Sequence, residues 1–393
     1  MTYDLVIVGG GIHGAGIAQS AASAGYSVLV LEKTAIAHGT SSKSSKLIHG
    51  GLRYLESGQI QLVFECLSER SLLLEIAPQL VRLESFFIPI YKHTRRRPWE
   101  IRAGLSLYAA LGKFKPAARF EQVPDSEWSK LDGISLENLQ AVYTYKDGAT
   151  DDVALTQAVM ESAKSLGAEL KMPAEFLSAV PGEDVNEIVY SFNGTTHSCK
   201  ARLLVNAAGP WANAILDKVT PIPAKREFDL VAGTHIVIDE PAPKGMYYVE
   251  APQDQRAVFV MPWQGKTMVG TTETVYVGDP SKVAPLPEEE TYLCQVVSHY
   301  FPKFKDVTRE ELVESFSGLR VLPHASGKAF SRPRETTFHV DKKRAPKIAT
   351  IYGGKLTAYR ITSEKFIAKF AAPLPRRKRK AQTHKLHLKP SLS

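Results

Sequence analysis

The fold is decided near the start of the chain by Leu5-Val6-Ile7-Val8-Gly9-Gly10-Gly11-Ile12-His13-Gly14. The four apolar residues predict a short strand of the kind that a parallel sheet buries on both faces. Gly9, Gly11 and Gly14 then form the pattern G-x-G-x-x-G. These glycines permit a tight turn, close approach of the backbone to a pyrophosphate, and close packing of a helix on the strand. The phosphates are expected at the N-terminus of that helix.

The next residues complete a dinucleotide-binding unit. A helix is expected over residues 14–24, and Gly25 is placed to end it. A second apolar strand, residues 28–31, leads to Glu32, eighteen residues after the third glycine. A carboxylate there accepts hydrogen bonds from a ribose, and the adjacent Lys33 is counted with it. Because every part falls at the required spacing, a glycine-rich turn without a ligand is a poor explanation.

A serine-rich run over residues 41–56, Ser-Ser-Lys-Ser-Ser-Lys-Leu-Ile-His-Gly-Gly-Leu-Arg-Tyr-Leu-Glu, indicates a flavin. Its hydroxyls and amides can continue along a pyrophosphate, its His-Gly-Gly turn brings backbone against a flat ring, and Arg53 can meet an anionic substrate. The cofactor-binding residues expected here are Thr40, Ser41, Ser42, Ser45, Lys46, Leu47, His49, Gly50 and Gly51.

Two later segments are also expected at the cofactor. Residues 206–211, Asn-Ala-Ala-Gly-Pro-Trp, follow a strand and permit close backbone approach. In residues 351–360, a helix starting at Gly354 would aim its positive end at the N1–C2=O edge of a reduced flavin, which carries negative charge. A nicotinamide gains nothing comparable, so FAD is favoured over NAD. The residues expected at the cofactor are Ala208, Gly209, Trp211, Gly353, Gly354, Lys355, Leu356 and Thr357.

Length and composition indicate a globular chain of two interleaved domains, because 393 residues with 44% hydrophobic content can bury a large core. The cofactor domain is expected over residues 1–70, 145–218 and 341–372, and a cap over 71–144 and 219–340. Cys66, Cys199 and Cys294 lack metal-ligand spacing and are interpreted as buried or incidental thiols in a reducing compartment. Neither a signal peptide nor a membrane span is expected.

The net charge of +8 is concentrated at the C-terminus, where seven bases and no acids follow Leu374. Residues 373–393 are therefore predicted to be a disordered basic tail. Such a tail can contact anionic lipid headgroups, and nucleic acid is the less favoured partner. The helical run over 100–115, with Trp99 before it, is either an interfacial helix or an ordinary cap helix.

These motifs resemble those of the FAD-dependent glycerol-3-phosphate dehydrogenases, within the flavoproteins that include amino-acid oxidases. The match covers about residues 4–370 and includes Phe-Ser-Gly-Leu-Arg at 316–320. The resemblance implies an α/β, Rossmann-like FAD-binding domain of the amino-acid-oxidase and glutathione-reductase type. This domain is interleaved with an α+β substrate-binding cap that contains a mixed or antiparallel sheet. Many relatives continue into a C-terminal helical domain, so the chain is expected to be a short form.

The resemblance implies oxidation of sn-glycerol 3-phosphate to dihydroxyacetone phosphate, with hydride passed to FAD N5 and electrons passed on to quinone. It also implies a cytoplasmic protein, peripheral on the inner face of the cell membrane. A phosphate needs several cations, and oxidation of an alcohol needs a proton acceptor, for which histidine is suited. The expected substrate-binding residues are Arg53, Tyr54, Arg320, Arg332 and Lys355, and the expected catalytic residues are His49, His235 and Arg320.

Two alternatives remain open at the level of sequence. One is a related oxidase of an amino acid or hydroxy acid that uses oxygen, where a single arginine would satisfy the substrate carboxylate. The other is a non-catalytic flavin-binding protein whose basic tail contacts lipid or nucleic acid. Neither His49 nor His235 can be singled out as the base. We predict no metal, because no cluster of His, Cys and carboxylates has metal spacing.

Overall fold

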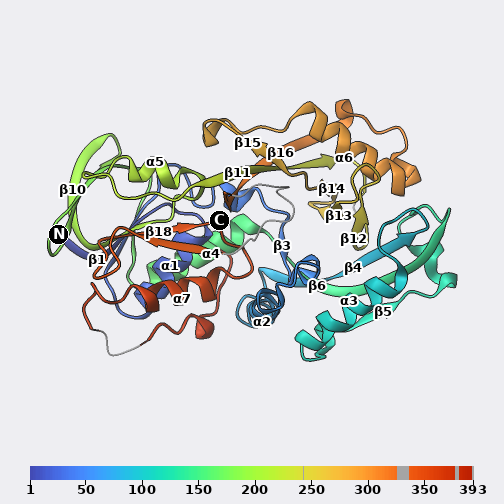
Figure 1. Ribbon diagram of the computed structural model, residues 1–393, viewed down its shortest axis with the longest axis horizontal. Coiled ribbons are helices and arrows are strands. Elements are labelled where there is room, and N and C mark those ends of the chain that lie inside the picture. The colour runs from blue at the N-terminus through green and yellow to red at the C-terminus, as the bar shows by residue number, and fades with distance from the viewer. Residues whose placement is uncertain (242, 325–335, 377–379, 392–393) are drawn as a thin grey trace.

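The computed structural model describes residues 1–241, 243–324, 336–376 and 380–391. Two sheets lie toward opposite ends of the molecule, with α1, α4 and α7 grouped at one end and the strands β4, β6 and β12–β14 at the other (Figure 1). The first sheet is built around β1, which pairs in parallel with β2 on one side and β10 on the other. The path of this sheet is β17-β18-β10-β1-β2-β7, with β9 and β8 attached to β10.

The first sheet is the expected dinucleotide-binding architecture, because β7, β2, β1, β10 and β18 all run parallel. Helix α1 follows β1 and packs against α4 and α7. The face of α1 toward the sheet is apolar and buried. The strands that precede and follow this helix, β1 and β2, are therefore apolar as well. The strands are β1 Thr2–Val8, β2 Val28–Leu31, β7 Glu169–Lys171, β8 Ala174–Pro181, β9 Asn186–Phe192, β10 Thr195–Asn206, β17 Thr337–Val340 and β18 Ile348–Tyr352. The helices are α1 Ile12–Ser23, α4 Asp152–Ser165, α5 Ala212–Leu216 and α7 Tyr359–Lys369.

The second sheet forms the cap. It is a mixed sheet, because β12 pairs in parallel with β4 whereas the other strand pairs of the sheet are antiparallel. Its path is β15-β11-β14-β13-β12-β4-β6-β3, with β16 on β11 and β5 on β6. The strands are β3 Leu47–Ile48, β4 Val81–Tyr91, β5 Phe120–Gln122, β6 Leu139–Thr150, β11 Phe228–Ile238, β12 Met246–Glu250, β13 Ala257–Trp263, β14 Lys266–Gly270, β15 Thr274–Tyr276 and β16 Leu312–Pro323. The helices are α2 Ile60–Ile76, α3 Pro98–Leu111 and α6 Pro287–Tyr300.

Three expected domain assignments differ from the sheet pairing. Strand β3 pairs with β6 in the cap sheet, although it lies within the expected cofactor range 1–70. Strand β6 pairs with β4 as far as Thr150, so the cap sheet extends past residue 144. Strand β17 pairs with β18 and therefore belongs to the cofactor sheet, although it lies before residue 341. The alternation of apolar and polar residues does not tell which sheet a strand joins.

The C-terminal segment was predicted to be disordered, and its described part is not. Leu388 is buried and its N–H donates to the carbonyl of Ile76 at the end of α2. Thr383 is also buried, and it bonds both Arg360 and Glu364 of α7. The prediction rested on the basic residues. Two side chains that lie among these bases in the sequence, the hydroxyl-bearing Thr383 and the apolar Leu388, attach the segment to the rest of the molecule. Cys66, Cys199 and Cys294 are all buried thiols, as predicted.

Candidate active site

The glycine loop after β1 has the geometry that the sequence predicted. Gly9 has φ of +110°, a conformation that residues with a side chain rarely adopt. A Cβ atom added to Gly14 would lie 1.9 Å from the carbonyl oxygen of Gly9, so only glycine lets α1 approach the turn this closely. The hydroxyl of Ser41 accepts a hydrogen bond from the N–H of Ile12 at the start of α1, at 2.9 Å. The loop and the serine run therefore meet at the N-terminus of α1.

The carboxylate of Glu32 lies beside this loop at the end of β2. It accepts hydrogen bonds from the N–H of Gly10 at 2.6 Å and from the N–H of Thr34 at 2.7 Å. The next residue, Lys33, is exposed and its ammonium group lies 3.2 Å from Glu175 on β8. Glu32 is thus placed for a ribose next to the glycine loop, whereas Lys33 points to a different partner.

The serine run crosses from the cofactor domain to the cap. Thr40 donates to the carbonyl of Leu319 on β16, and Ser42 bonds the carbonyls of its own turn. Leu47 is buried in β3 and pairs with β6. The buried ammonium of Lys46 lies 2.7 Å from Asp152 at the start of α4, so it neutralises a buried carboxylate and is not directed at a pyrophosphate.

The His-Gly-Gly turn is tied to the late motif and to a buried polar chain. The N–H of His49 donates to the hydroxyl of Thr357 at 3.1 Å, which brings the two distant motifs together. The N–H of Gly50 donates to the Tyr108 hydroxyl at 2.9 Å, and this hydroxyl donates to Asp147 at 2.5 Å. Asp147 is paired with buried Arg70 at 2.7 Å. Gly51 follows with φ of +77°, which fixes the direction of the turn.

The late glycines do not begin a helix. Gly353 and Gly354 have φ of +70° and +114°, which are not helical, and α7 begins only at Tyr359. The prediction of a helix from Gly354 was therefore wrong by five residues. Leu356 packs beside the core of the cofactor domain.

A histidine that the sequence analysis did not select lies between the two glycine motifs. A Cβ added to Gly354 would lie 1.9 Å from Nε2 of His13, so this side chain lies against the late turn. Its Nδ1 is buried and has no hydrogen-bond partner among the described residues. Burial lowers the pKa of His13 to about 4, so the ring is neutral near pH 7.

The segment after β10 lies beside the first glycine loop. A Cβ on Gly9 would lie 2.7 Å from the carbonyl oxygen of Ala207. The N–H of Ala208 bonds the side chain of Asn206, and Gly209 has positive φ. The ring of Trp211 lies against Gly39. Ala208, Gly209 and Trp211 are thus in the same region as the loop, as a shared nucleotide site requires.

A cluster of cations lies where the cap meets the cofactor domain. Arg53 and Arg320 both lie near one oxygen of Glu273, at 4.0 and 3.6 Å. Arg320 also donates to the Thr272 carbonyl at 3.3 Å and to the Thr271 hydroxyl at 3.2 Å. We refer to Arg53, Arg320 and Glu273 as the arginine cluster.

Tyr54 connects this cluster to the late motif. The Lys355 ammonium lies 3.4 Å from the centre of the Tyr54 ring, and the Arg53 guanidinium lies 5.8 Å from it. Such contacts are favourable because the face of an aromatic ring carries partial negative charge. Three of the cations expected at a phosphate are therefore near one another. Arg53 comes from the serine-rich run, Lys355 from the late glycine motif and Arg320 from the cap strand β16.

His235 lies on β11, next to the strand that carries Arg320. Its Nε2 is 2.9 Å from the hydroxyl of Ser45, and its ring stacks on Phe316. The side chain is buried, and burial together with Arg320 and Lys46 lowers its pKa to about 3. The imidazole is therefore neutral near pH 7, and in this environment it is a weak base. The structure brings Ser45 and His235 together across 190 residues of sequence.

Arg332 lies outside the described residues. Sequence reasoning missed Glu273 and His13, which lie beside the predicted site residues. A signal existed for His13, which lies within the glycine motif itself, and for Glu273, which ends Gly-Thr-Thr-Glu at 270–273. In the described ranges, no three His, Cys, Asp or Glu residues are grouped as a metal ion requires, and no helix is long and apolar enough to cross a membrane.

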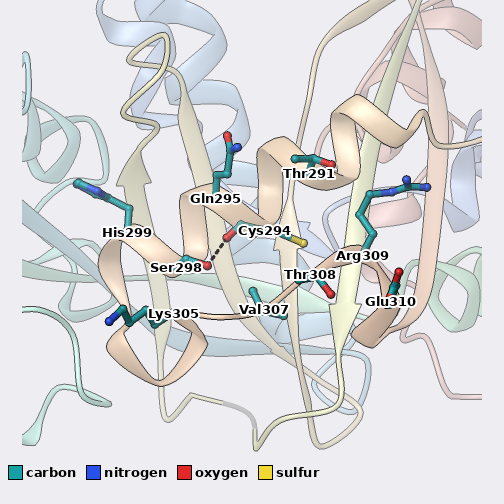
Figure 2. A pocket seen from close by; sticks show the side chains of 10 residues that line it. All are labelled: Thr291, Cys294, Gln295, Ser298, His299, Lys305, Val307, Thr308, Arg309 and Glu310. Atoms are coloured by element: carbon teal, nitrogen blue, oxygen red, sulfur yellow. Dashed lines mark hydrogen bonds between the residues drawn. The ribbon is translucent and has the colours of Figure 1, made fainter.

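A separate hollow of about 640 Å³ lies on the cap between α6 and residues 305–310 (Figure 2). Its walls include Thr291, Gln295 and His299. It contains none of the predicted site residues, and no glycine turn or buried cation lines it. The chemistry is therefore assigned to the junction between the two sheets and not to this hollow.

The junction fits FAD. The cradle formed by Gly9, Gly14 and Gly354 leaves no room for a side chain, and the orphaned Nδ1 of His13 lies beside it. Glu32 is placed for a ribose, and the arginine cluster lies at the other end of the serine run. These features fit an FAD-binding oxidoreductase.

Comparisons with known proteins agree with this class. Residues 4–360 match the family model described as FAD dependent oxidoreductase, and the chain belongs to this family, with FAD as its cofactor. It is 37% identical over 368 residues to a glycerol-3-phosphate dehydrogenase from Pseudomonas aeruginosa, covering 92% of this chain and 70% of the relative. It is 34% identical to D-erythritol 1-phosphate dehydrogenase from Brucella abortus, covering 93% and 72%.

Among solved structures, the chain is similar to glycerol-3-phosphate dehydrogenase from Bacillus halodurans complexed with FAD. The TM-score is 0.79 at 26% identity, covering 98% of this chain and 68% of that one. The family expected from the sequence motifs, the cofactor and the fold class are therefore confirmed.

Proposed function

We propose that this chain oxidises sn-glycerol 3-phosphate to dihydroxyacetone phosphate. When bound, FAD supplies the acceptor for the hydride, and a quinone is the proposed onward acceptor of the electrons. The relatives named glycerol-3-phosphate dehydrogenase support the substrate. The quinone is carried over from the family resemblance.

The arginine cluster carries the proposal. A phosphate monoester has close to two negative charges near neutral pH, so it needs more than one cation. Arg53 and Arg320 approach the same oxygen of Glu273 from segments that are far apart in the sequence, and the Tyr54 ring contacts both Arg53 and Lys355. Guanidinium groups suit this role because they bind phosphate oxygens in pairs. Together these residues would hold the phosphate and leave the carbinol carbon toward the His-Gly-Gly turn.

His235 and His49 are the proposed acceptors of the hydroxyl proton. His235 is neutral near pH 7, and its Nε2 lies at hydrogen-bond distance from the Ser45 hydroxyl. The positive charge of Arg320 is one of the causes that lower the pKa of His235. His49 is fixed through its backbone to Thr357 beside the cofactor cradle. Arg320, which the sequence also predicts as a catalytic residue, is proposed to act by holding the substrate phosphate.

Two other substrates are alternatives. A hydroxy acid or amino acid would present a carboxylate, for which one arginine is enough, so the paired arginines favour a phosphate. The relative named D-erythritol 1-phosphate dehydrogenase supports a longer polyol phosphate, which would use the same cations.

The test is an anaerobic titration of the FAD-loaded protein with glycerol 3-phosphate, following loss of the oxidised-flavin absorption. Glycerol, D-erythritol 1-phosphate, lactate and alanine serve as comparison substrates. We expect bleaching by glycerol 3-phosphate alone at low concentration, and loss of that response in Arg53→Met and Arg320→Met. Bleaching by lactate or alanine that survives both substitutions would refute the phosphate assignment.

We also propose attachment to the inner face of an anionic membrane. On α3 and the turn after it, the large apolar side chains of Trp99, Leu107 and Phe114 are exposed. Lys385 and Lys389 are exposed on the docked C-terminal segment. Flotation with phosphatidylglycerol vesicles is expected for the wild type and reduced in Trp99→Glu and in Lys385→Glu. Equal flotation of both variants and the wild type would contradict membrane attachment by these residues.

A further inference from the structure

Glu289 is a buried carboxylate in the first turn of α6 with four hydrogen-bond donors around it. One oxygen accepts from the hydroxyls of Thr272 at 2.7 Å and Thr274 at 2.6 Å. The other accepts from the Thr234 hydroxyl at 2.6 Å and the Leu286 N–H at 3.2 Å. A buried carboxylate without such donors would be costly, so these four donors are what permit its burial.

These threonines are neighbours of the residues that bind substrate in the proposed function. Thr234 precedes His235 on β11. Thr272 and Thr274 flank Glu273, and the Thr272 carbonyl and Thr271 hydroxyl accept hydrogen bonds from Arg320. The Thr272 hydroxyl also accepts from the N–H of Thr234 at 2.9 Å. The segment 271–274 therefore donates hydrogen bonds to Glu289 on one side and accepts hydrogen bonds from Arg320 of the arginine cluster on the other.

We propose that Glu289 is a positioning residue for substrate binding, which fixes segment 271–274 and thereby the direction of Arg320. The inference rests on the proposed function for the identity of the substrate. The linkage between Glu289 and Arg320 rests on the hydrogen bonds of the threonines. Glu289 lies behind the threonines, and its carboxylate is fully occupied by its four donors. Its effect is therefore carried by the threonine hydroxyls.

The consequence of losing the carboxylate follows from hydrogen-bond chemistry. In Glu289→Gln, an amide group replaces one of the two oxygens and donates where that oxygen accepted. One pair of donors on Glu289 must then turn away or face another donor, and the charge that strengthened all four bonds is gone. Segment 271–274 is then no longer fixed at its threonines, so Arg320 loses the alignment of its backbone acceptor.

The next residue provides a matched control. Glu290 is on the same helix turn, and its carboxylate bonds Arg309 and the Ser315 hydroxyl at the surface. Arg309 is one of the residues that line the hollow in Figure 2. Glu290→Gln makes the same chemical change one residue along, and the hydrogen bonds of Glu290 among the described residues go to Arg309 and Ser315, outside segment 271–274.

The experiment compares steady-state kinetics of the FAD-loaded wild type, Glu289→Gln and Glu290→Gln with glycerol 3-phosphate. We expect KM to rise about tenfold or more in Glu289→Gln with kcat changed less than about threefold, because phosphate contacts act alike on ground and transition states. Glu290→Gln is expected to match the wild type. Equal KM values for the two variants would overturn the inference.

A second pair covers the case in which Glu289→Gln fails to fold. Thr274→Val removes one hydroxyl from the carboxylate and Thr274→Ser retains it. We expect KM to rise in the valine variant and to be restored in the serine variant. A KM increase of the same size in both would assign the effect to packing and would also overturn the inference.

A failure of the proposed function is recognised separately. If the wild type is not reduced by glycerol 3-phosphate, that function fails, and the probe becomes inorganic phosphate, measured by perturbation of the flavin spectrum. The inference then predicts about tenfold weaker phosphate binding in Glu289→Gln than in Glu290→Gln. Equal phosphate affinities would refute it.

Discussion

Tyr108→Phe tests the buried polar chain that supports the His-Gly-Gly turn. The Tyr108 hydroxyl is wholly buried on α3, accepts from the Gly50 N–H and donates to Asp147. Burial and Asp147 raise the pKa of this hydroxyl well above its usual range, so it stays protonated and remains a donor. Removing it leaves one buried N–H and one oxygen of a buried carboxylate each short of a partner.

The expected magnitude follows from those two groups. An unsatisfied buried donor costs about 1–3 kcal/mol, and a lost hydrogen bond to a charged group costs a similar amount. We therefore expect Tyr108→Phe to lower the free energy of unfolding by about 4 kcal/mol. Asp147 keeps its ion pair with Arg70. The substitution therefore removes the hydrogen bonds at the His-Gly-Gly turn and leaves the rest of the buried polar chain in place.

Tyr359→Phe is the matched control, because the Tyr359 hydroxyl is equally buried and has no hydrogen-bond partner among the described residues. Removing that hydroxyl is expected to leave stability unchanged or slightly higher. Guanidinium unfolding of the FAD-loaded proteins, followed by tryptophan fluorescence and by flavin release, measures both variants. If Tyr108→Phe unfolds at the same denaturant concentration as Tyr359→Phe, the account of the buried chain is wrong.

Two further predictions concern the cofactor cradle and His235. In Gly14→Ala the new methyl would lie 1.9 Å from the Gly9 carbonyl oxygen, so we expect purified protein with little FAD by absorbance, whereas Gly104→Ala, with open space around it, stays loaded. The pKa of His235 is lowered to about 3 on folding, so unfolded chains take up the proton first as pH falls below about 6.5, and stability is lost between pH 6.5 and pH 3. His235→Gln removes this loss, and we expect it to narrow the stability difference between pH 7 and pH 4.5 by about 3 kcal/mol in denaturant titrations. The same pH dependence in the variant and the wild type would show that His235 is not the group responsible.

Local motifs allowed the cofactor domain to be predicted. The G-x-G-x-x-G turn, the apolar strands around it and Glu32 are fixed by sterics over about thirty residues, and the structure places them as expected. The late motif was located correctly, but its helix was placed five residues too early. Positive φ at two consecutive glycines opposes a helix, and the sequence alone did not distinguish a cap from a turn there.

Other predictions failed for reasons of tertiary contact. Lys46 lies in a serine run typical of phosphate binding, but the buried carboxylate of Asp152, more than one hundred residues later, needs its charge. The C-terminal segment has the composition of a disordered tail. However, Thr383 bonds Arg360 and Glu364 of α7, and Leu388 is buried in the core of the cofactor domain and bonds the carbonyl of Ile76 on α2.

The sequence by itself determined the nucleotide-binding unit, the flavin and the family, because glycine sterics and hydrogen-bonding residues act over short separations. Only the tertiary structure decided how the proposed substrate site is assembled. Arg53 and Arg320 are remote in sequence and meet at Glu273, and Ser45 meets His235 across 190 residues of sequence. Such contacts depend on how the serine-rich run is placed against β11 and β16, and no local pattern records the distance between side chains that are so far apart in the chain.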